Sequence, residues 1–279
     1  MATTKGNVNP KKNSSGFQGV RNAIWILVAC FVLALAFFKL VLGNPDNFVN
    51  GDPTQAVKDG NLLGTVYKGG VVVPVIITLL FSVIALSVER FFALRTAFGK
   101  SSLGKFVKEV KAAITAGDMN KAQALCDKQQ GCVANVVGAS LAAYKEMENT
   151  GNMKRAQKVA KIQQAHEEAT QLEMPTLQMN MPIIATIVTL GTLTALFGTV
   201  VGMIRSFAAL ASGGGGDSLQ LSEGISEALV NTASGILTSW VAVVAYNYYS
   251  NKIDKLTYAL DEVGYTIAQT YEANHADEA

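Results

Sequence analysis

The chain has 279 residues, of which 49% are hydrophobic and only 16% are charged, and its net charge is +2. Soluble domains carry about 25% charged residues, so this deficit indicates a membrane protein rather than a soluble protein with a large core. The small net charge, without a basic tract, argues against nucleic-acid binding.

The first third of the chain contains two apolar runs. Residues 1–22 are polar and basic, and we expect a disordered tail. Residues 23–42 form the first run; a basic start before a short apolar run also fits a secretory signal, but no small-x-small cleavage site follows. We therefore expect an uncleaved transmembrane helix, with Lys39 reaching the far interface. Residues 43–69 are polar and hold two prolines, and they are too short and too poor in apolar residues for a domain.

The second apolar run, residues 70–90, is rich in Val and Ile, but its length of about twenty residues predicts a transmembrane helix. The long polar segment 91–181 repeats apolar residues at helical spacing. Breaks at Gly117 and Gly131 divide the segment, so we predict a domain of several helices.

Two further spans follow, at residues 182–211 and 224–250, joined by the short loop 212–223. Residues 251–279 place Ile253, Leu256, Leu260, Val263 and Ile267 on one face. We therefore expect the fourth helix to continue out of the membrane as a helical tail. The sequence thus predicts an all-α polytopic membrane protein with four transmembrane helices.

Basic residues gather in the first tail, in segment 91–181 close to the second span, and in the last tail. By the positive-inside rule both termini and this helical domain are cytoplasmic, and segments 43–69 and 212–223 are periplasmic. The length and composition are those of a bacterial inner-membrane protein.

Motifs for catalysis or metal binding are incomplete. Gly99-Lys100-Ser101 matches only the end of a phosphate-binding loop, because Leu94 stands where Gly is required. His166-Glu167 begins like a zinc-protease motif, but Thr170 replaces the second His. The three cysteines are Cys30, Cys126 and Cys132. Their spacing fits no zinc site, while a disulfide between the last two stays possible. We therefore predict no enzyme, no metal and no cofactor, and an external energy source such as an ion gradient.

The last two spans carry polar side chains at helical spacing. In the fourth span, Glu227, Asn231 and Ser234 share one face, and Thr232 and Gly235 lie on a second face about 100° away. In the third span Thr192 and Thr199 align, and Gly198 and Gly202 form a G-x-x-x-G step for close helix approach. Which face would look into a pore stays open.

Hydroxyl groups in membrane helices often bond only to their own backbone. Glu227 is the stronger candidate, because a carboxylate in a span costs a few kcal/mol unless it faces water or a partner. Snorkelling at the outer interface is the alternative. The middle of the membrane holds Thr, Ser and Asn but no acid or His, so a proton route would need a carboxylate from another subunit.

These residues resemble the ExbB/TolQ/MotA family of proton-channel subunits, and most closely ExbB. Residues 198–207, GTVVGMIRSF, resemble its G-T-V-x-G-M-x-x-x-F motif, and residues 224–235, GISEALVNTASG, its G-I-x-E-A-L-x-x-T-A-x-G motif. Ala245-Tyr246-Asn247 matches its A-Y-N ending. Two departures are Thr192 and Val241, which stand where the family often has Pro. The first span is additional to the three of ExbB and TolQ.

The resemblance implies a ring, typically of five copies, around two copies of an ExbD-like single-span partner that carries an intramembrane Asp. Thr199 and Thr232 would line the lumen and meet that Asp, with Glu227 at the periplasmic approach. The polar faces add Thr192, Asn231 and Ser234 as candidates for the proton pathway, and Gly198, Gly202 and Gly235 for helix packing.

The expected role is an ExbB-like subunit that uses the proton motive force to energise TonB-dependent transport across the outer membrane, through a TonB-like periplasm-spanning protein. A TolQ-like subunit for envelope constriction and a gliding or flagellar stator subunit are alternatives. A structural membrane scaffold is an alternative of another class. The lack of further carboxylates favours H⁺ over Na⁺.

Overall fold

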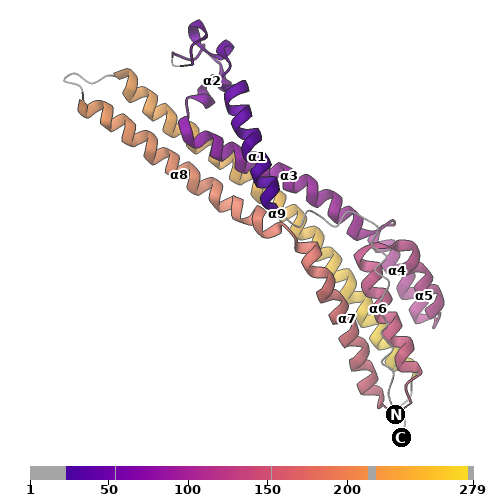
Figure 1. Ribbon diagram of the computed structural model, residues 1–279. Helices are drawn as coiled ribbons and strands as arrows, with labels where there is room; N and C mark the ends of the chain where they lie inside the picture. Colours follow the sequence, from indigo (N-terminus) through magenta and orange to yellow (C-terminus); the bar gives the residue numbers. More distant parts are fainter. Residues whose placement is uncertain (1–22, 54, 152, 213–217, 276–279) are drawn as a thin grey trace, which may run out of the picture. The chain divides into compact units, whose positions relative to one another are not determined.

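The computed structural model describes residues 23–53, 55–151, 153–212 and 218–275. These ranges are mostly helical, with one isolated antiparallel bridge between Phe48 and Val57. Four of the helices are long and apolar enough to cross a membrane (Figure 1). The described chain forms two compact units, one of residues 23–89 with 180–249 and the other of residues 90–179 with 250–275. The predicted all-helical architecture with four candidate spans is therefore present.

The first unit contains the apolar helices. They are α1 (Ala23–Phe37), which continues as a π-helical turn, η1 (Phe38–Leu42), then α3 (Val73–Phe98) as far as Glu89, α8 (Met181–Ser212) and the first half of α9 (Ser218–Asn274). Helices satisfy every backbone polar group internally, which a segment in lipid requires. Pro74 and Pro182 each occupy the second position of their helix, where no intrahelical N–H bond is lost.

Helix α8 runs alongside the first half of α9 (Figure 1), and glycines bring the two backbones together. A methyl group on Gly202 would lie 2.7 Å from the carbonyl oxygen of Gly224, and one on Gly198 would lie 2.6 Å from Cβ of Asn231. A methyl group on Gly235 would overlap Ala195. Any larger residue at these positions would push the helices apart.

Between α1 and α3 the chain folds into a compact segment, which we call the outer segment because the sequence predicts it to be periplasmic. Its elements are η2 (Pro45–Asn47), η3 (Val49–Gly51), α2 (Leu62–Tyr67) and η4 (Gly70–Val72). Phe48 is fully buried and meets the edge of Tyr67, which stacks on Phe38 at 4.7 Å between ring centres. The side chain of Asn47 donates to the carbonyls of Val41 and Leu42. The polar composition of this segment does not predict such packing.

The second unit is a helical domain. It consists of α4 (Leu103–Thr115), α5 (Met119–Gln129), α6 (Gly131–Glu148), α7 (Arg155–Gln178) and the second half of α9. The breaks predicted at Gly117 and Gly131 both separate helices, and both glycines have positive φ. The apolar face predicted for the tail is buried, with Leu256, Leu260 and Val263 at 0% exposure. This part of α9 therefore belongs to the core of the unit.

Two motifs of this unit have structural roles. The buried side chain of Gln129 accepts from the Ser101 amide, and the Gln129 carbonyl accepts from the Lys100 amide. The backbone donors that a phosphate loop would need are thus occupied by the protein itself. Cys126 and Cys132 are buried free thiols, so the open possibility of a disulfide between them is not realised. Burial raises the pKa of Cys126 to about 12, which keeps it unreactive.

Candidate functional site

A row of four hydroxyl groups joins α8 to α9. Thr199 Oγ1 lies 2.5 Å from Thr232 Oγ1, and Thr192 Oγ1 lies 3.0 Å from Ser239 Oγ. Each pair is seven residues from the other along both helices, which corresponds to about 10.5 Å. We call Thr192, Thr199, Thr232 and Ser239 the hydroxyl line. Three of its members, Thr192, Thr199 and Thr232, are site residues predicted from the sequence. Thr199 and Thr232 contact each other directly.

The Thr199–Thr232 pair makes three hydrogen-bond contacts but has only two hydroxyl hydrogens to donate. Thr199 lies 3.0 Å from the carbonyl of Ala195, and Thr232 lies 3.0 Å from that of Ala228, in addition to their mutual contact. Each hydroxyl has a single hydrogen to donate but can accept two. Two hydrogens therefore serve three contacts, and the donor in the Thr–Thr contact can change. Such a pair can either donate to or accept from a third polar group.

Glu227 and Asn231 have neighbours that differ from those of the hydroxyl line. The Asn231 side chain is fully buried and donates to the carbonyl of Gly69 at 3.0 Å, just before α3. Ser234 is half-buried, and its carbonyl accepts from the buried hydroxyl of Thr238. The two wheel faces of the fourth span therefore have different surroundings: one meets the residues that lead into α3, and the other carries the hydroxyl line.

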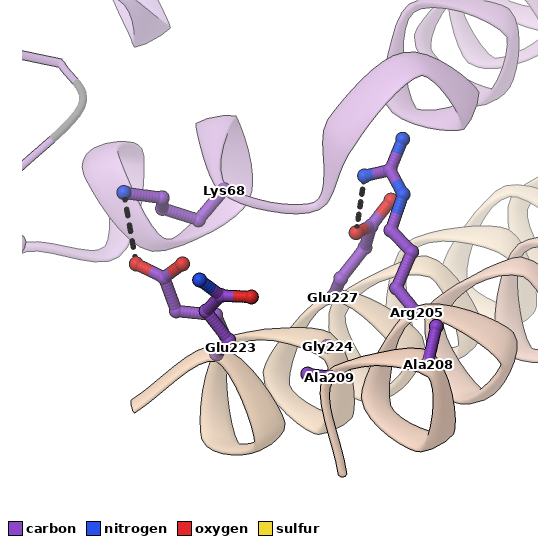
Figure 2. A pocket seen from close by; sticks show the side chains of 8 residues that line it. Lys68, Arg205, Ala208, Ala209, Glu223, Gly224 and Glu227 are labelled. Carbon is purple, nitrogen blue, oxygen red and sulfur yellow. Dashed lines mark hydrogen bonds and ion pairs between the residues drawn. The ribbon is translucent and has the colours of Figure 1, made fainter. Parts of the chain in front are cut away.

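Near the last turns of α8 and the first turns of α9, this unit has an open hollow of about 680 Å³. Figure 2 shows its charged side chains, with Lys68 paired to Glu223 at 3.3 Å and Arg205 paired to Glu227 at 2.7 Å. The Glu227 side chain is only 6% exposed, whereas that of Arg205 is 53% exposed. Within the described residues, Oε1 of Glu227 is buried without a hydrogen-bond partner. Glu227 is therefore a buried carboxylate at the edge of an open hollow, and one of its oxygens is paired with Arg205.

Two members of this site, Ser239 and Arg205, were not among the site residues predicted from the sequence. Ser239 shares the wheel face of Thr232, so the helical repeat carries the signal for it. Arg205 was seen only as an unassigned position in a motif, because its pairing with Glu227 depends on the register of α8 against α9. In the described part of the chain no group of three or more His, Cys, Asp or Glu is placed to hold a metal ion.

The matched region covers both polar helices. Residues 137–262 match the MotA/TolQ/ExbB proton channel family. The chain is 32% identical over 114 residues to the Tol-Pal system protein TolQ of Pseudomonas aeruginosa, covering 40% of the chain and 47% of that relative. It is 34% identical over 87 residues to the putative biopolymer transport protein ExbB-like 3 of Synechocystis, covering 30% and 41%.

A second TolQ, from Haemophilus influenzae, is 38% identical over 85 residues, or 30% of the chain and 37% of the relative. The matched parts thus span less than half the length of these relatives, and both TolQ and ExbB-like names occur among them. The matched residues include the whole hydroxyl line together with Arg205 and Glu227. The hydroxyl line and the Arg205–Glu227 pair therefore lie in the part of this chain that is similar to the MotA/TolQ/ExbB proton channel family.

Proposed function

We propose that this chain is an ExbB-like subunit of an inner-membrane motor driven by protons, and that it energises TonB-dependent transport across the outer membrane. The hydroxyl line is the observation that carries the proposal, since it places paired hydroxyls between two apolar helices of a proton channel family. An ExbD-like single-span partner supplies the Asp that carries the proton, and a TonB-like protein takes up the motion.

The chemistry of the hydroxyl line suits a mobile carboxyl group. A protonated acid needs an acceptor and an ionised acid needs donors, and the Thr199–Thr232 pair can offer either without a fixed charge. A Lys or Arg at this depth would instead hold the acid ionised. Each proton that crosses 100 mV releases about 2.3 kcal/mol, which suits many small mechanical steps.

The exposed part of the hydroxyl line also supports the proposal that several copies of this chain form a ring. Thr192 is exposed in the single chain, and a polar group at this depth needs a water-filled or protein surrounding. A ring of about five copies around two partner helices would enclose the hydroxyl line and leave apolar side chains such as Leu196 and Phe197 for lipid and for neighbouring copies. Both termini and the helical domain are then cytoplasmic, in keeping with the distribution of basic residues.

A TolQ-like role in envelope constriction is the second candidate. The observation in its favour is the match to TolQ of Pseudomonas aeruginosa, which extends over 114 residues, compared with 87 for the ExbB-like relative from Synechocystis. Both roles use the same proton pathway. The identity of the partner protein decides between them, because the two motors deliver their motion to different envelope proteins.

Proton flux into liposomes that contain the purified complex tests the pathway. We expect Thr199→Val with Thr232→Val to assemble normally and to lose at least about tenfold in flux, because valine keeps the volume but removes the hydroxyls. Thr238→Val is the matched control, since this buried hydroxyl bonds only within its own helix. Normal flux in the double variant would reject the hydroxyl line as a pathway and would favour a structural scaffold.

A further inference from the structure

We propose that Arg205 positions Glu227 as the outer proton acceptor, by binding one carboxylate oxygen and leaving the other to take the proton. The proposal rests on the function proposed above and adds a residue that the helical pattern did not identify. Its basis is the asymmetry of a single ion pair in the hollow at the outer end of α8 and α9 (Figure 2).

The ion pair between Arg205 and Glu227 involves only one of the two carboxylate oxygens. Nη1 of Arg205 donates to Oε2 of Glu227 at 2.7 Å, while Oε1 is buried and has no hydrogen-bond partner in the described part of the chain. Arginine and carboxylate often pair through two parallel hydrogen bonds, which would occupy both oxygens. The one-sided geometry leaves a strong acceptor unsatisfied, and a buried acceptor without a partner is uncommon enough to require an explanation.

The backbone next to Glu227 maintains this arrangement. Gly70 has a φ of +77°, and a Cβ there would overlap Oε1 of Glu227. Glycine is thus required both for the backbone conformation and for the space beside the free oxygen. The protein keeps Oε1 clear of side chains at Gly70, yet places no donor against it. A single buried oxygen without a donor suits a proton, which needs one acceptor, better than a metal cation, which needs several oxygens.

The exposure of the two partners supplies a route for the proton. More than half of the Arg205 side chain is exposed, whereas Glu227 is buried behind it. Movement of the guanidinium into the hollow uncovers the carboxylate, and a proton from a hydronium ion in the outer water then forms an O–H bond at Oε1. The bond breaks when the carboxylate of the single-span partner takes the proton, and Arg205 returns to the ionised Glu227.

A purely structural ion pair is the competing explanation, and the hollow contains a comparison for it. Lys68 and Glu223 form a pair at 3.3 Å whose carboxylate is 49% exposed, and ion pairs near the surface contribute little to stability. Losing one member of a buried pair is different, because the remaining charge is left uncompensated, whereas replacing both members is often tolerated. A double-variant cycle on Arg205 and Glu227 therefore separates the structural role from the role in proton uptake.

The experiment uses the complex purified from its native membrane, with melting temperature and proton flux in liposomes measured on the same preparations. We expect Arg205→Gln and Glu227→Gln each to reduce flux at least about tenfold, and Arg205→Gln to lower the melting temperature by about 5 °C or more. The double variant should recover most of the melting temperature but none of the flux. Arg205→Lys, which keeps the charge, should be intermediate in flux, and Lys68→Gln should stay within about twofold of the wild type.

Two results would overturn the inference. Recovery of flux in the double variant would mean that the pair is only structural, and wild-type flux in Arg205→Gln would mean that Arg205 does not position the acceptor. A wild-type complex that conducts no protons would instead reject the proposed function, and the inference with it. This failure of the proposed function can be distinguished from failure of the inference, because the wild type itself would lack flux while the melting temperatures would still show whether Arg205 and Glu227 interact.

Discussion

Gly202→Ala tests the close approach of α8 and α9, on which the hydroxyl line depends. The added methyl carbon would lie 2.7 Å from the carbonyl oxygen of Gly224 and 2.8 Å from the backbone nitrogen of Ala228. Both atoms are backbone atoms of α9, so no side chain can rotate away. Restoring an ordinary contact of about 3.4 Å requires the helices to separate locally by roughly 0.7 Å.

The energetic cost follows from this separation. Overpacking by one methyl group costs about 1–3 kcal/mol, and replacing a helical glycine by alanine returns about 0.8 kcal/mol. We therefore expect a net loss of about 0.2–2 kcal/mol in the free energy of unfolding. Because Thr199 and Gly202 lie within one turn of each other, the same movement would lengthen the 2.5 Å Thr199–Thr232 contact to roughly 3.2 Å.

The assay combines thermal unfolding of the purified complex with proton flux in liposomes. Gly138→Ala in α6 is the matched control, since its new methyl group would lie 3.6 Å from the Gln123 side chain, an ordinary contact. We expect the control to be neutral or more stable, and Gly202→Ala to be less stable and slower in flux. If Gly202→Ala were as stable and as active as the wild type, the close packing of these helices in the assembled protein would be refuted.

Two further predictions concern regions outside the polar helices. His166 is buried in the helical domain with Nδ1 2.9 Å from Ser140 Oγ, and burial lowers its pKa despite the opposing effect of Asp261. As pH falls below about 6.5, the imidazole therefore becomes protonated in the unfolded chain before it does in the folded chain, and the folded state loses stability. The melting temperature of His166→Asn should change less between about pH 7.5 and about pH 5.5 than that of the wild type. Asn47→Ala should lower the free energy of unfolding of the outer segment by about 2 kcal/mol, because the carbonyls of Val41 and Leu42 lose their donor. Added protease should therefore cleave this segment about thirtyfold faster than in Asp59→Ala, a control at an exposed position. Equal pH dependence in the first case, or equal cleavage in the second, would contradict these assignments.

The sequence predicted those features of the structure that depend on the residues of a single helix. Length and hydropathy identify the spans, and the spacing of Leu256, Leu260 and Val263 identifies the buried face of the tail. The glycines at positions 117 and 131 also have a local signal, because a positive φ favours glycine where one helix ends and the next begins. These features depend on neighbours within a few residues, so a helical wheel and a hydropathy window are sufficient to find them.

Features that depend on two helices were not accessible in this way. The wheel separated Glu227 from Thr232 but could not assign their surroundings, which are fixed by the contacts of Asn231 with Gly198 and Gly69. Arg205 pairs with a residue 22 positions away across a hairpin whose register no local pattern encodes. Likewise, the outer segment is polar in composition, yet its packing relies on a few aromatic rings and one asparagine rather than on a periodic pattern.

The composition of the complex tests the central claim most directly. We would purify the chain gently from its native membrane and determine the mass of the intact complex and the identity of each component by native mass spectrometry. The account predicts several copies of this chain together with a small single-span protein that has a carboxylate in its membrane helix, and that protein would identify the process that the motor drives. An oligomer that never retains such a protein would contradict the account and would leave the hydroxyl line as a packing contact between helices.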